Sequence, residues 1–450
     1  MSYTLSLFQR GLITMKLEWF QMVWTQGLRL ARVSIFKEIS TMYLLEEEAM
    51  RSGFGERESL RFDSVIVRHG GEIGIKGAWT RRVYERRLLN NLKGMLKHYE
   101  IPYDAILRRH GRFYLKTPAA TEASLKLSEV FGVSSLSSAL ETTSRMRDIV
   151  AKSVFLASLT LSEGNSFAVR CRRVGQHPYT SSDVCREVGR EILSELSDLG
   201  LRVNLKNPDV KLGVEVRDDR AFVYSEVVRG AGGLPLGTQK KVVCLLSGGI
   251  DSPVACWLAM KRGCPIVPVY FDNSPFTDES TTERALSVAG VLFDWAIGFP
   301  RRVYVVPHGQ NLTEFKMKCP ERLTCILCKR MMYRIAERIA EMERAEGIVT
   351  GEAIGEQASQ TLQNLRVLNT AAKKYPIHRP LLGFDKAETE RIAQKIGTYK
   401  PSARRAKGCS AAPRKPATMA KPQQVAEAEE GLNIVEMVER SVKSLKVVNL

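Results

Sequence analysis

The sequence predicts an α/β protein whose C-terminal half is a doubly wound parallel sheet and whose N-terminal half consists of smaller α+β units. Between residues 240 and 352, short apolar segments typical of buried strands alternate with helical segments, and this alternation is characteristic of a parallel sheet covered by helices. Between residues 62 and 230, strands follow one another more closely and helices are fewer, which favours mixed α+β units.

Length, composition and charge limit the class of protein. A chain of 450 residues is long enough for two to four domains, and its 44% hydrophobic and 26% charged residues are ordinary for a globular protein. The net charge of +18 favours a polyanionic partner such as nucleic acid, although a basic proteome or a hot habitat has the same signature. The nine cysteines form no even disulfide framework, so we expect a cytoplasmic protein. No apolar run reaches the roughly 18 residues of a membrane span, so we expect no membrane partner.

Residues 1–61 form an N-terminal extension that we assign to no domain. The segment from Leu12 to Phe36 mixes apolar, aromatic and basic residues without a continuous apolar core or a cleavage site, so it does not predict a signal peptide. One interpretation is an upstream extension from a misjudged start codon, because Met42 and Met50 stand just before the first clear domain. The other is a basic amphipathic arm that touches RNA. We favour the first.

The segment 62–140 is expected to form a ferredoxin-like domain, because its elements follow the order strand, helix, strand, strand, helix. The helix is basic along much of its length. The predicted elements are a strand at 64–68, a helix at 78–98, strands at 104–109 and 112–116, and a helix at 120–130.

The segment 141–230 is expected to form a second α+β unit. Its first strand carries Arg170, Arg172 and Arg173, and strand alternation places the first two on one face and the third on the other. These arginines are candidates for RNA contacts, and a solvated strand edge is the alternative. Asp183 is expected near a helix N-cap. The predicted elements are helices at 145–160 and 184–198 and strands at 166–173, 210–216 and 221–227, with a hairpin turn at 218–220.

A small polar loop at residues 247–252, Ser-Gly-Gly-Ile-Asp-Ser, joins an apolar strand to a helix that ends at Gly263. We call it the Ser-Gly-Gly loop. Backbone N–H groups of such a loop and of the first helical turn converge on phosphate oxygens, and the glycines allow close approach. The loop lacks the Gly-Lys-Ser/Thr ending of a Walker loop. It resembles the PP-loop of ATP pyrophosphatases, which split ATP into AMP and pyrophosphate and place AMP on an oxygen. Five matching residues behind an apolar strand argue against an ordinary strand-to-helix turn.

The rest of the C-terminal half continues the alternation of strands and helices. In parallel sheets of this kind, ligands bind at the carboxyl ends of the strands. A final amphipathic helix is expected at 422–444. The other predicted elements are strands at 265–271, 303–307 and 348–352 and helices at 279–290 and 329–346.

Two further stretches identify a family. Residues 170–177 together with 205–210 look like a THUMP domain, an RNA-binding module of tRNA-modifying enzymes, and residues 230–239 resemble the connector that follows it. Residues 62–445 as a whole resemble the tRNA 4-thiouridine synthetase (tRNA uracil 4-sulfurtransferase) family. The resemblance implies a ferredoxin-like domain, a THUMP domain at 141–230 and a PP-loop ATP pyrophosphatase domain at 231–450. It also implies an enzyme that adenylates a tRNA uridine at O4 and replaces that oxygen with sulfur. Some family members also supply sulfur for the thiazole of thiamine.

The same resemblance implies an ATP site and RNA contacts. Asp251 is expected to be catalytic and to orient Mg²⁺ on the phosphates, with a helix cap as the alternative role. Lys329 would offset the charge of the leaving pyrophosphate. Candidate RNA-binding residues are Arg170, Arg172, Arg173 and Lys206. Candidate ATP-binding residues are Leu245, Leu246, Ser247, Gly248, Gly249, Ser252, Tyr270, Phe271, Lys329, Gly351 and Gln360.

Cysteines are the candidates for sulfur chemistry. In the family, a cysteine at the position of Cys409 takes part in sulfur transfer. Cys325 and Cys328, expected just before the helix of Lys329, resemble a pair found chiefly in archaeal members. Those members use three such cysteines to hold an iron–sulfur cluster, so Cys325, Cys328 and Cys409 are candidate ligands of a [4Fe–4S] or [3Fe–4S] cluster. Zinc, a redox pair or two buried apolar side chains are alternatives for the Cys-x-x-Cys pair. We expect Cys171, Cys185, Cys244, Cys256 and Cys264 to fill the core.

The chain resembles a short form of the family, without the rhodanese domain of bacterial long forms. This implies an external sulfur donor: a cysteine desulfurase persulfide, another carrier or free sulfide. A homodimer is compatible with the resemblance. One alternative function is a PP-loop tRNA thiolase that acts on a different base position. Another is an RNA-binding protein without activity, which the intact Ser-Gly-Gly loop and Lys329 argue against.

Overall fold

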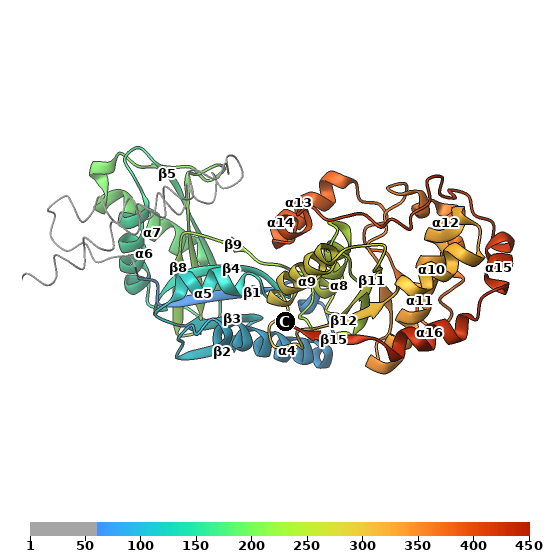
Figure 1. Cartoon of the computed structure of the whole chain (residues 1–450). Coiled ribbons are helices and arrows are strands. Elements are labelled where there is room, and N and C mark those ends of the chain that lie inside the picture. The colour runs from blue at the N-terminus through green and yellow to red at the C-terminus, as the bar shows by residue number, and fades with distance from the viewer. Residues whose placement is uncertain (1–60) are drawn as a thin grey trace, which may run out of the picture. The chain divides into compact units, whose positions relative to one another are not determined.

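The structure is a computed structural model and describes residues 61–450 (Figure 1). The predictions for the extension 1–61, including the start-codon and RNA-arm interpretations, lie outside the described residues apart from residue 61. Across residues 61–450, no helix combines the length and the apolar character needed to cross a membrane.

A nine-stranded sheet organises the N-terminal half of the described chain. Its strands follow the order β2-β3-β1-β4-β8-β7-β5-β6, and β9 pairs with β4. The elements are β1 (Ser64–His69), α3 (Gly71–Gly74), α4 (Ala78–His98), β2 (Ala105–Arg109), β3 (Arg112–Lys116), α5 (Ala120–Leu127), β4 (Val133–Thr143), α6 (Met146–Thr160), β5 (Ser166–Val174), α7 (Ser181–Glu195), the 3₁₀ turn η1 (Ser197–Leu199), β6 (Arg202–Val203), β7 (Val210–Arg217), β8 (Arg220–Tyr224) and β9 (Val228–Arg229).

Strand β4 joins the two predicted N-terminal units into one sheet. It pairs antiparallel with β1 along its first part and with β8 along its second part. The boundary that we predict between residues 140 and 141 therefore falls inside this strand. The sequence pattern predicts no strand here, because four serines interrupt the apolar residues and serine has little preference for strands. One of them, Ser137, is fully buried and accepts a hydrogen bond from Arg68 (2.9 Å), which explains why a polar residue is tolerated there.

The C-terminal half is built on a six-stranded sheet of order β14-β13-β10-β11-β12-β15. The first five strands are parallel, and β15 pairs antiparallel with β12. The elements are β10 (Val242–Leu245), α8 (Asp251–Lys261), β11 (Ile266–Asp272), α9 (Glu279–Asp294), β12 (Arg302–Pro307), α10 (Gly309–Lys318), the 3₁₀ turn η2 (Glu321–Leu323), α11 (Thr324–Glu343), β13 (Ile348–Val349), the 3₁₀ turn η3 (Ala358–Gln360), α12 (Leu362–Asn369), β14 (Ile377–His378), α13 (Lys386–Ile396), α14 (Tyr399–Ser402), α15 (Pro422–Glu430), α16 (Ile434–Lys443) and β15 (Lys446–Asn449).

Both faces of this sheet are buried, as the predicted doubly wound fold requires. Along β10, Val243 points into a core shared with α10, α11, α12 and α16, whereas Val242 and Cys244 point into a second core shared with α8, α9 and α13. The alternation of side chains across a strand produces this division. Helices therefore lie on both faces, and the loops at the carboxyl ends of the parallel strands are left to form a site (Figure 1).

Several predicted boundaries in this half are wrong. Helix α11 begins at Thr324 instead of residue 329, because Ile326 and Leu327 are buried and extend its apolar face by more than a turn. The predicted C-terminal helix is two helices that separate at Gly431, and the Asn433 side chain caps the second by accepting from the N–H of Glu436 (3.2 Å). The strand predicted at 348–352 is β13, which spans only Ile348–Val349, so Gly351 lies in the loop that follows it.

Candidate functional site

The Ser-Gly-Gly loop is held in shape by its own hydroxyl groups. The backbone N–H of Ser247 donates to Oγ of Ser252 (2.8 Å), and the N–H of Gly249 donates to Oγ of Ser247 (3.2 Å). Helix α8 begins at Asp251, so the last two residues of the loop form the start of the helix, and no side chain caps its first turn. Its free N–H groups and helix dipole therefore remain available for an anion, which is the arrangement that the sequence predicts.

Two glycines let other segments approach this loop. A Cβ atom at Gly351 would lie 2.6 Å from the backbone N of Ser252, so only glycine allows the β13 loop to pack on the start of α8. A Cβ atom at Gly248 would lie 2.5 Å from Nε of Arg284, so the arginine side chain lies directly over the loop.

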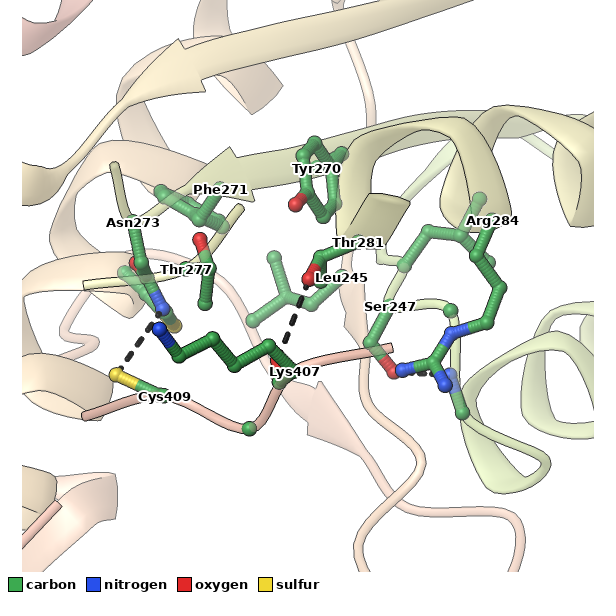
Figure 2. A pocket seen from close by; sticks show the side chains of 15 residues that line it. Leu245, Ser247, Tyr270, Phe271, Asn273, Thr277, Thr281, Arg284, Lys407 and Cys409 are labelled. Atoms are coloured by element: carbon green, nitrogen blue, oxygen red, sulfur yellow. Dashed lines mark hydrogen bonds between the residues drawn. The ribbon is translucent and has the colours of Figure 1, made fainter. Parts of the chain in front are cut away.

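Two cavities adjoin at the carboxyl ends of the parallel strands and share Leu245, Ser247 and Met332. The first, of about 340 Å³, extends from the Ser-Gly-Gly loop to Cys409, and Figure 2 shows the side chains that line it. The second, of about 310 Å³, extends from the loop to Lys329 and the β13 loop. Their combined volume suits a nucleotide-sized ligand.

Every residue that we predict to bind ATP lines one or both cavities. The first is lined by Leu245, Leu246, Ser247, Gly248, Gly249, Tyr270 and Phe271. The second is lined by Leu245, Ser247, Ser252, Lys329, Gly351 and Gln360, and by the predicted catalytic Asp251.

Lys329 is held at the second cavity by a buried carboxylate. Its Nζ donates to Glu352 (3.0 Å), which also accepts from Tyr333 (2.5 Å) and from Nε of Arg379 (2.8 Å). Although burial acts to raise the pKa of Glu352, Lys329, Tyr333 and Arg379 outweigh burial and lower it, so the carboxylate is charged near pH 7. A chain segment that follows β13 thereby fixes the position of a lysine on α11.

Asp251 does not cap a helix, so the alternative role is not supported. It is the first residue of α8, and its carboxylate accepts from Nζ of Lys386 (2.9 Å). Lys386 also pairs with Glu356 (2.7 Å), and these hydrogen bonds outweigh its burial and raise its pKa. Lys386 is not among the predicted site residues, because it lies 135 residues beyond Asp251 and nothing in its local sequence marks it.

Arg284 is a second residue that sequence reasoning misses. It lies on α9, lines the first cavity and is drawn beside Ser247 in Figure 2. One of its terminal nitrogens donates to the carbonyl of Arg404 (3.0 Å), whereas its Nε is buried and has no hydrogen-bond partner within residues 61–450. A buried donor without a partner beside an anion-binding loop is chemically suited to a phosphate oxygen. The one sequence feature that could have pointed to Arg284 is that it is the only basic residue of α9.

Two of the three predicted sulfur residues, Cys328 and Cys409, pack against the same hydrophobic core. Cys325 and Cys328 lie within the first turns of α11, not before the helix as predicted, and Cys409 lines the first cavity. Burial raises the pKa of both helix cysteines; the thiol of Cys409 raises each further, and Lys329 opposes the change. The Cys409 thiol is therefore near enough to both helix cysteines to affect their pKa values. Asn273 approaches the Cys409 sulfur at 4.0 Å (Figure 2).

A fully buried histidine lies on the other side of Cys328. Nε2 of His308 is 3.4 Å from the Cys328 sulfur. Burial lowers the pKa of His308 to about 3, so its imidazole is neutral near pH 7. Within residues 61–450, no group of three or more His, Cys, Asp or Glu side chains is arranged to hold a metal ion.

The remaining cysteines partly follow the prediction. Cys244 and Cys256 are buried, as expected of core residues. Cys171, Cys185 and Cys264 are only half-buried, and Cys264 lies in the connection between α8 and β11 rather than inside an element. These three are therefore not core residues in the sense predicted.

The four candidate RNA-binding residues lie away from these cavities, and none lines either one. On β5, Arg170 and Arg172 are exposed, and the less exposed Arg173 donates to the carbonyl of Gly175 (2.9 Å). Arg170 donates to the carbonyl of Leu205, and Lys206 is exposed in the same loop. The alternation predicted for the three arginines is confirmed.

Three families match successive parts of the chain. Residues 64–137 match the ThiI ferredoxin-like domain, residues 144–226 match the THUMP domain, and residues 237–434 match the family described as Thiamine biosynthesis protein (ThiI). The order of the three matches is the order that the sequence predicts.

Similar proteins match over most of their length. A probable tRNA sulfurtransferase of Methanosarcina mazei is 43% identical over 86% of this chain and 95% of its own length. One of Methanothermobacter thermautotrophicus is 40% identical over 84% of this chain and 96% of its own. Among solved structures, a 4-thiouridine synthetase in complex with RNA and ATP is 33% identical, covers 86% of this chain and 99% of its own, and superposes with a TM-score of 0.77.

Proposed function

The chain belongs to the ThiI family of tRNA sulfurtransferases, and from that membership we propose that it is an ATP-dependent enzyme that converts a tRNA uridine to 4-thiouridine. One observation carries the proposal: the nucleotide-sized space at the Ser-Gly-Gly loop is bordered by a phosphate-binding loop and lysine and, at Cys409, by a sulfur residue. A cell compartment that contains tRNA, ATP and reduced thiols, the cytoplasm, suits this reaction.

The first step is adenylation. Uridine O4 attacks the α-phosphorus of ATP, the bond to the bridging oxygen breaks, and pyrophosphate leaves. Lys329, Arg284 and the N–H groups of the Ser-Gly-Gly loop would offset the charge that grows on pyrophosphate. The donors are already held in place, Lys329 by Glu352 and the loop by Ser252, so little reorganisation is required.

Asp251 would act on the metal that accompanies ATP. A carboxylate beside a phosphate-binding loop is a suitable ligand for Mg²⁺, directly or through water. Mg²⁺ would supply positive charge that stabilises the departing phosphates. Lys386 holds the Asp251 carboxylate in the protein described here, and it would also be close enough to the loop to attract the phosphates.

The second step is sulfur transfer. A sulfur atom at the oxidation level of sulfide adds at C4, the bond from C4 to O4 breaks, and AMP leaves with that oxygen. Cys325, Cys328 and Cys409 would present this sulfur, because their thiols are neighbours and Cys409 borders the cavity. The same three thiols would be the ligands of an iron–sulfur cluster once they move together, because they are not arranged to hold a metal ion in this structure; the cluster would supply an iron with an open position for sulfide. Without a cluster, a persulfide on Cys409 would add its outer sulfur at C4 and expel AMP, and a second thiol would then attack the Cys409 sulfur, so that 4-thiouridine leaves and a disulfide with Cys409 forms.

tRNA would bind through the N-terminal half. Arg170, Arg172, Arg173 and Lys206 are proposed contacts, supported by the match to the THUMP domain and by the exposure of all but Arg173, which is half-buried. Such contacts go mainly to phosphates and shape, which suits a module that positions RNA without reading its sequence. The sulfur donor would be a cysteine desulfurase persulfide, another carrier or free sulfide. The enzyme would act as a homodimer. A second use would be the supply of sulfur for thiamine.

The test is incubation of unmodified tRNA with the enzyme, ATP, Mg²⁺ and sulfide without oxygen, followed by nucleoside analysis. We expect 4-thiouridine together with AMP and pyrophosphate. Thiolation at C2, or thiolated cytidine, would support the alternative acceptor. ATP cleavage without any thionucleoside, or no ATP cleavage at all, would contradict the proposal.

A further inference from the structure

His308 makes an unusual contact for a buried histidine. It directly precedes α10 at the end of β12, it has no solvent exposure, and its ring lies edge-to-face with Phe271 (centroids 5.4 Å apart). Buried ring nitrogens ordinarily pair with oxygen atoms, but Nε2 of His308 faces the sulfur of Cys328 at 3.4 Å. The direction of this hydrogen bond depends on which ring nitrogen carries the proton.

Arg440 determines which way the side-chain amide of Asn311, the neighbour of His308, faces. Asn311 is buried, and its Oδ1 lies 2.9 Å from a terminal nitrogen of Arg440. A guanidinium can only donate, so the amide oxygen must face Arg440 and the amide NH₂ must face the opposite way. Arg440 is itself fixed by Glu314 (2.7 Å), which makes this orientation robust.

The amide orientation in turn decides the tautomer of His308. Nδ2 of Asn311 lies 3.2 Å from Nδ1 of His308 and 2.9 Å from Oγ of Ser441. The Ser441 hydroxyl gives its own hydrogen to the carbonyl of Met437 (2.7 Å), so its oxygen is free to accept. Nδ1 of His308 therefore also accepts. A neutral imidazole that accepts at Nδ1 carries its hydrogen on Nε2, and Nε2 faces the sulfur.

We propose that His308 is a positioning residue for sulfur transfer, in which its Nε2–H donates a hydrogen bond to the sulfur of Cys328. The proposal rests on the proposed role of Cys328. A sulfur lone pair that accepts this hydrogen bond is held in one direction, whatever the sulfur carries. It also holds the sulfur next to His308 at the end of β12, whereas Lys329 on the same helix lines the second cavity. The chain Arg440–Asn311–His308–Cys328 thus links α16 to the sulfur residues.

Two substitutions separate donation from packing. His308→Gln can present its amide NH₂ where Nε2 stood, whereas His308→Leu fills similar space and cannot donate. We expect His308→Leu to lower sulfur transfer about 10–100-fold while ATP–pyrophosphate exchange is unchanged, and His308→Gln to retain most of the transfer. His378→Gln, at an exposed histidine of β14, is the matched control and should transfer sulfur normally. Normal transfer by His308→Leu, or equal losses in both His308 variants, would overturn the proposal.

A second measurement needs neither a bound cofactor nor activity. The chain has six histidines, so ¹⁵N-histidine labelling gives few imidazole signals, and the signal absent from His308→Gln identifies residue 308. We expect a protonated Nε2 and an unprotonated Nδ1 in the wild-type protein. A proton on Nδ1 would overturn the proposal even if the leucine variant fails to fold. A wild-type enzyme that adenylates RNA but transfers no sulfur would refute the proposed function instead, and the tautomer would still decide whether the hydrogen bond exists.

Discussion

Replacing Glu352 with glutamine should damage adenylation more than its effect on stability alone would cause. The carboxylate is 5% exposed and compensates two cations, Lys329 and Arg379, whose side chains are 23% and 9% exposed. Removing one partner from a buried charge cluster costs about 3–5 kcal/mol, because the remaining charges lose their compensation. The freed lysine would also move, and a misplacement of about 1 Å at a reacting centre can cost about 100-fold in rate.

The chain contains a matched control for this change. Glu343, at the end of α11, is also buried and accepts from a lysine, an arginine and a tyrosine. Its partners, Lys241 and Arg302, stand at the starts of β10 and β12, the edge of the sheet opposite the cavities. They are about 40% exposed, so water can take over part of the lost interaction, and we expect Glu343→Gln to cost about 1–3 kcal/mol.

The assay compares the two variants at a temperature where both are folded. Urea unfolding gives the free energies of unfolding, and ATP–pyrophosphate exchange with tRNA gives the adenylation rate. We expect exchange to fall about 10–100-fold in Glu352→Gln and to remain normal in Glu343→Gln. Equal exchange in the two folded variants would refute the idea that Glu352 positions Lys329, and it would leave Glu352 with a structural role only.

Three further predictions concern acid stability, RNA binding and the cysteines. Glu429 accepts from Arg330 and Arg334, which outweigh its burial and lower its pKa from 4.5 to about 2. It should therefore add about 3 kcal/mol to the free energy of unfolding above pH 4.5, and this contribution should be lost as the pH falls toward 2. Glu429→Gln should flatten this part of the plot of unfolding free energy against pH, and an unchanged plot would contradict the prediction. Replacing both Arg170 and Arg172 by alanine should make the plot of log tRNA-binding constant against log salt concentration less steep by about 1.5. Arg190→Ala on α7, outside the proposed contacts, should leave the slope unchanged. An unaltered slope in the double variant would argue against these contacts. Cys325→Ser should stop thiolation but not ATP–pyrophosphate exchange. Cys319→Ser is the control and should stay active, because the wild-type Cys319 thiol only donates to the carbonyl of Ala428 (3.2 Å). Thiolation by the Cys325 variant would remove that residue from the mechanism.

Local patterns in the sequence were sufficient to predict the fold class and the place of the Ser-Gly-Gly loop, whereas most of the expected ATP residues came from the resemblance to the family. Alternating strands and helices require a parallel sheet, and a Ser-Gly-Gly loop between a strand and a helix must lie at its ligand-binding edge. All of the residues predicted to bind ATP, from the loop pattern or from the resemblance, line the two cavities.

What the sequence did not predict depends on contacts between distant segments. Lys386 reaches Asp251 across 135 residues, and Arg284 reaches the loop through the packing of α9. The start of α11 was placed at residue 329, after the Cys-x-x-Cys pair, whereas Ile326 and Leu327 between the cysteines are core residues of the helix. The tautomer of His308 depends on Arg440, which lies on a helix far along the chain and has no motif to mark it.

The most direct test of the central claim follows the oxygen of the substrate. tRNA carrying ¹⁸O at O4 of the target uridine is incubated with the enzyme, ATP, Mg²⁺ and a sulfur donor, and the AMP and pyrophosphate are analysed by mass spectrometry. If O4 is adenylated and then expelled when sulfur adds at C4, each 4-thiouridine formed should release one AMP that carries the heavy oxygen. Thiolated tRNA accompanied by unlabelled AMP would contradict adenylation at O4.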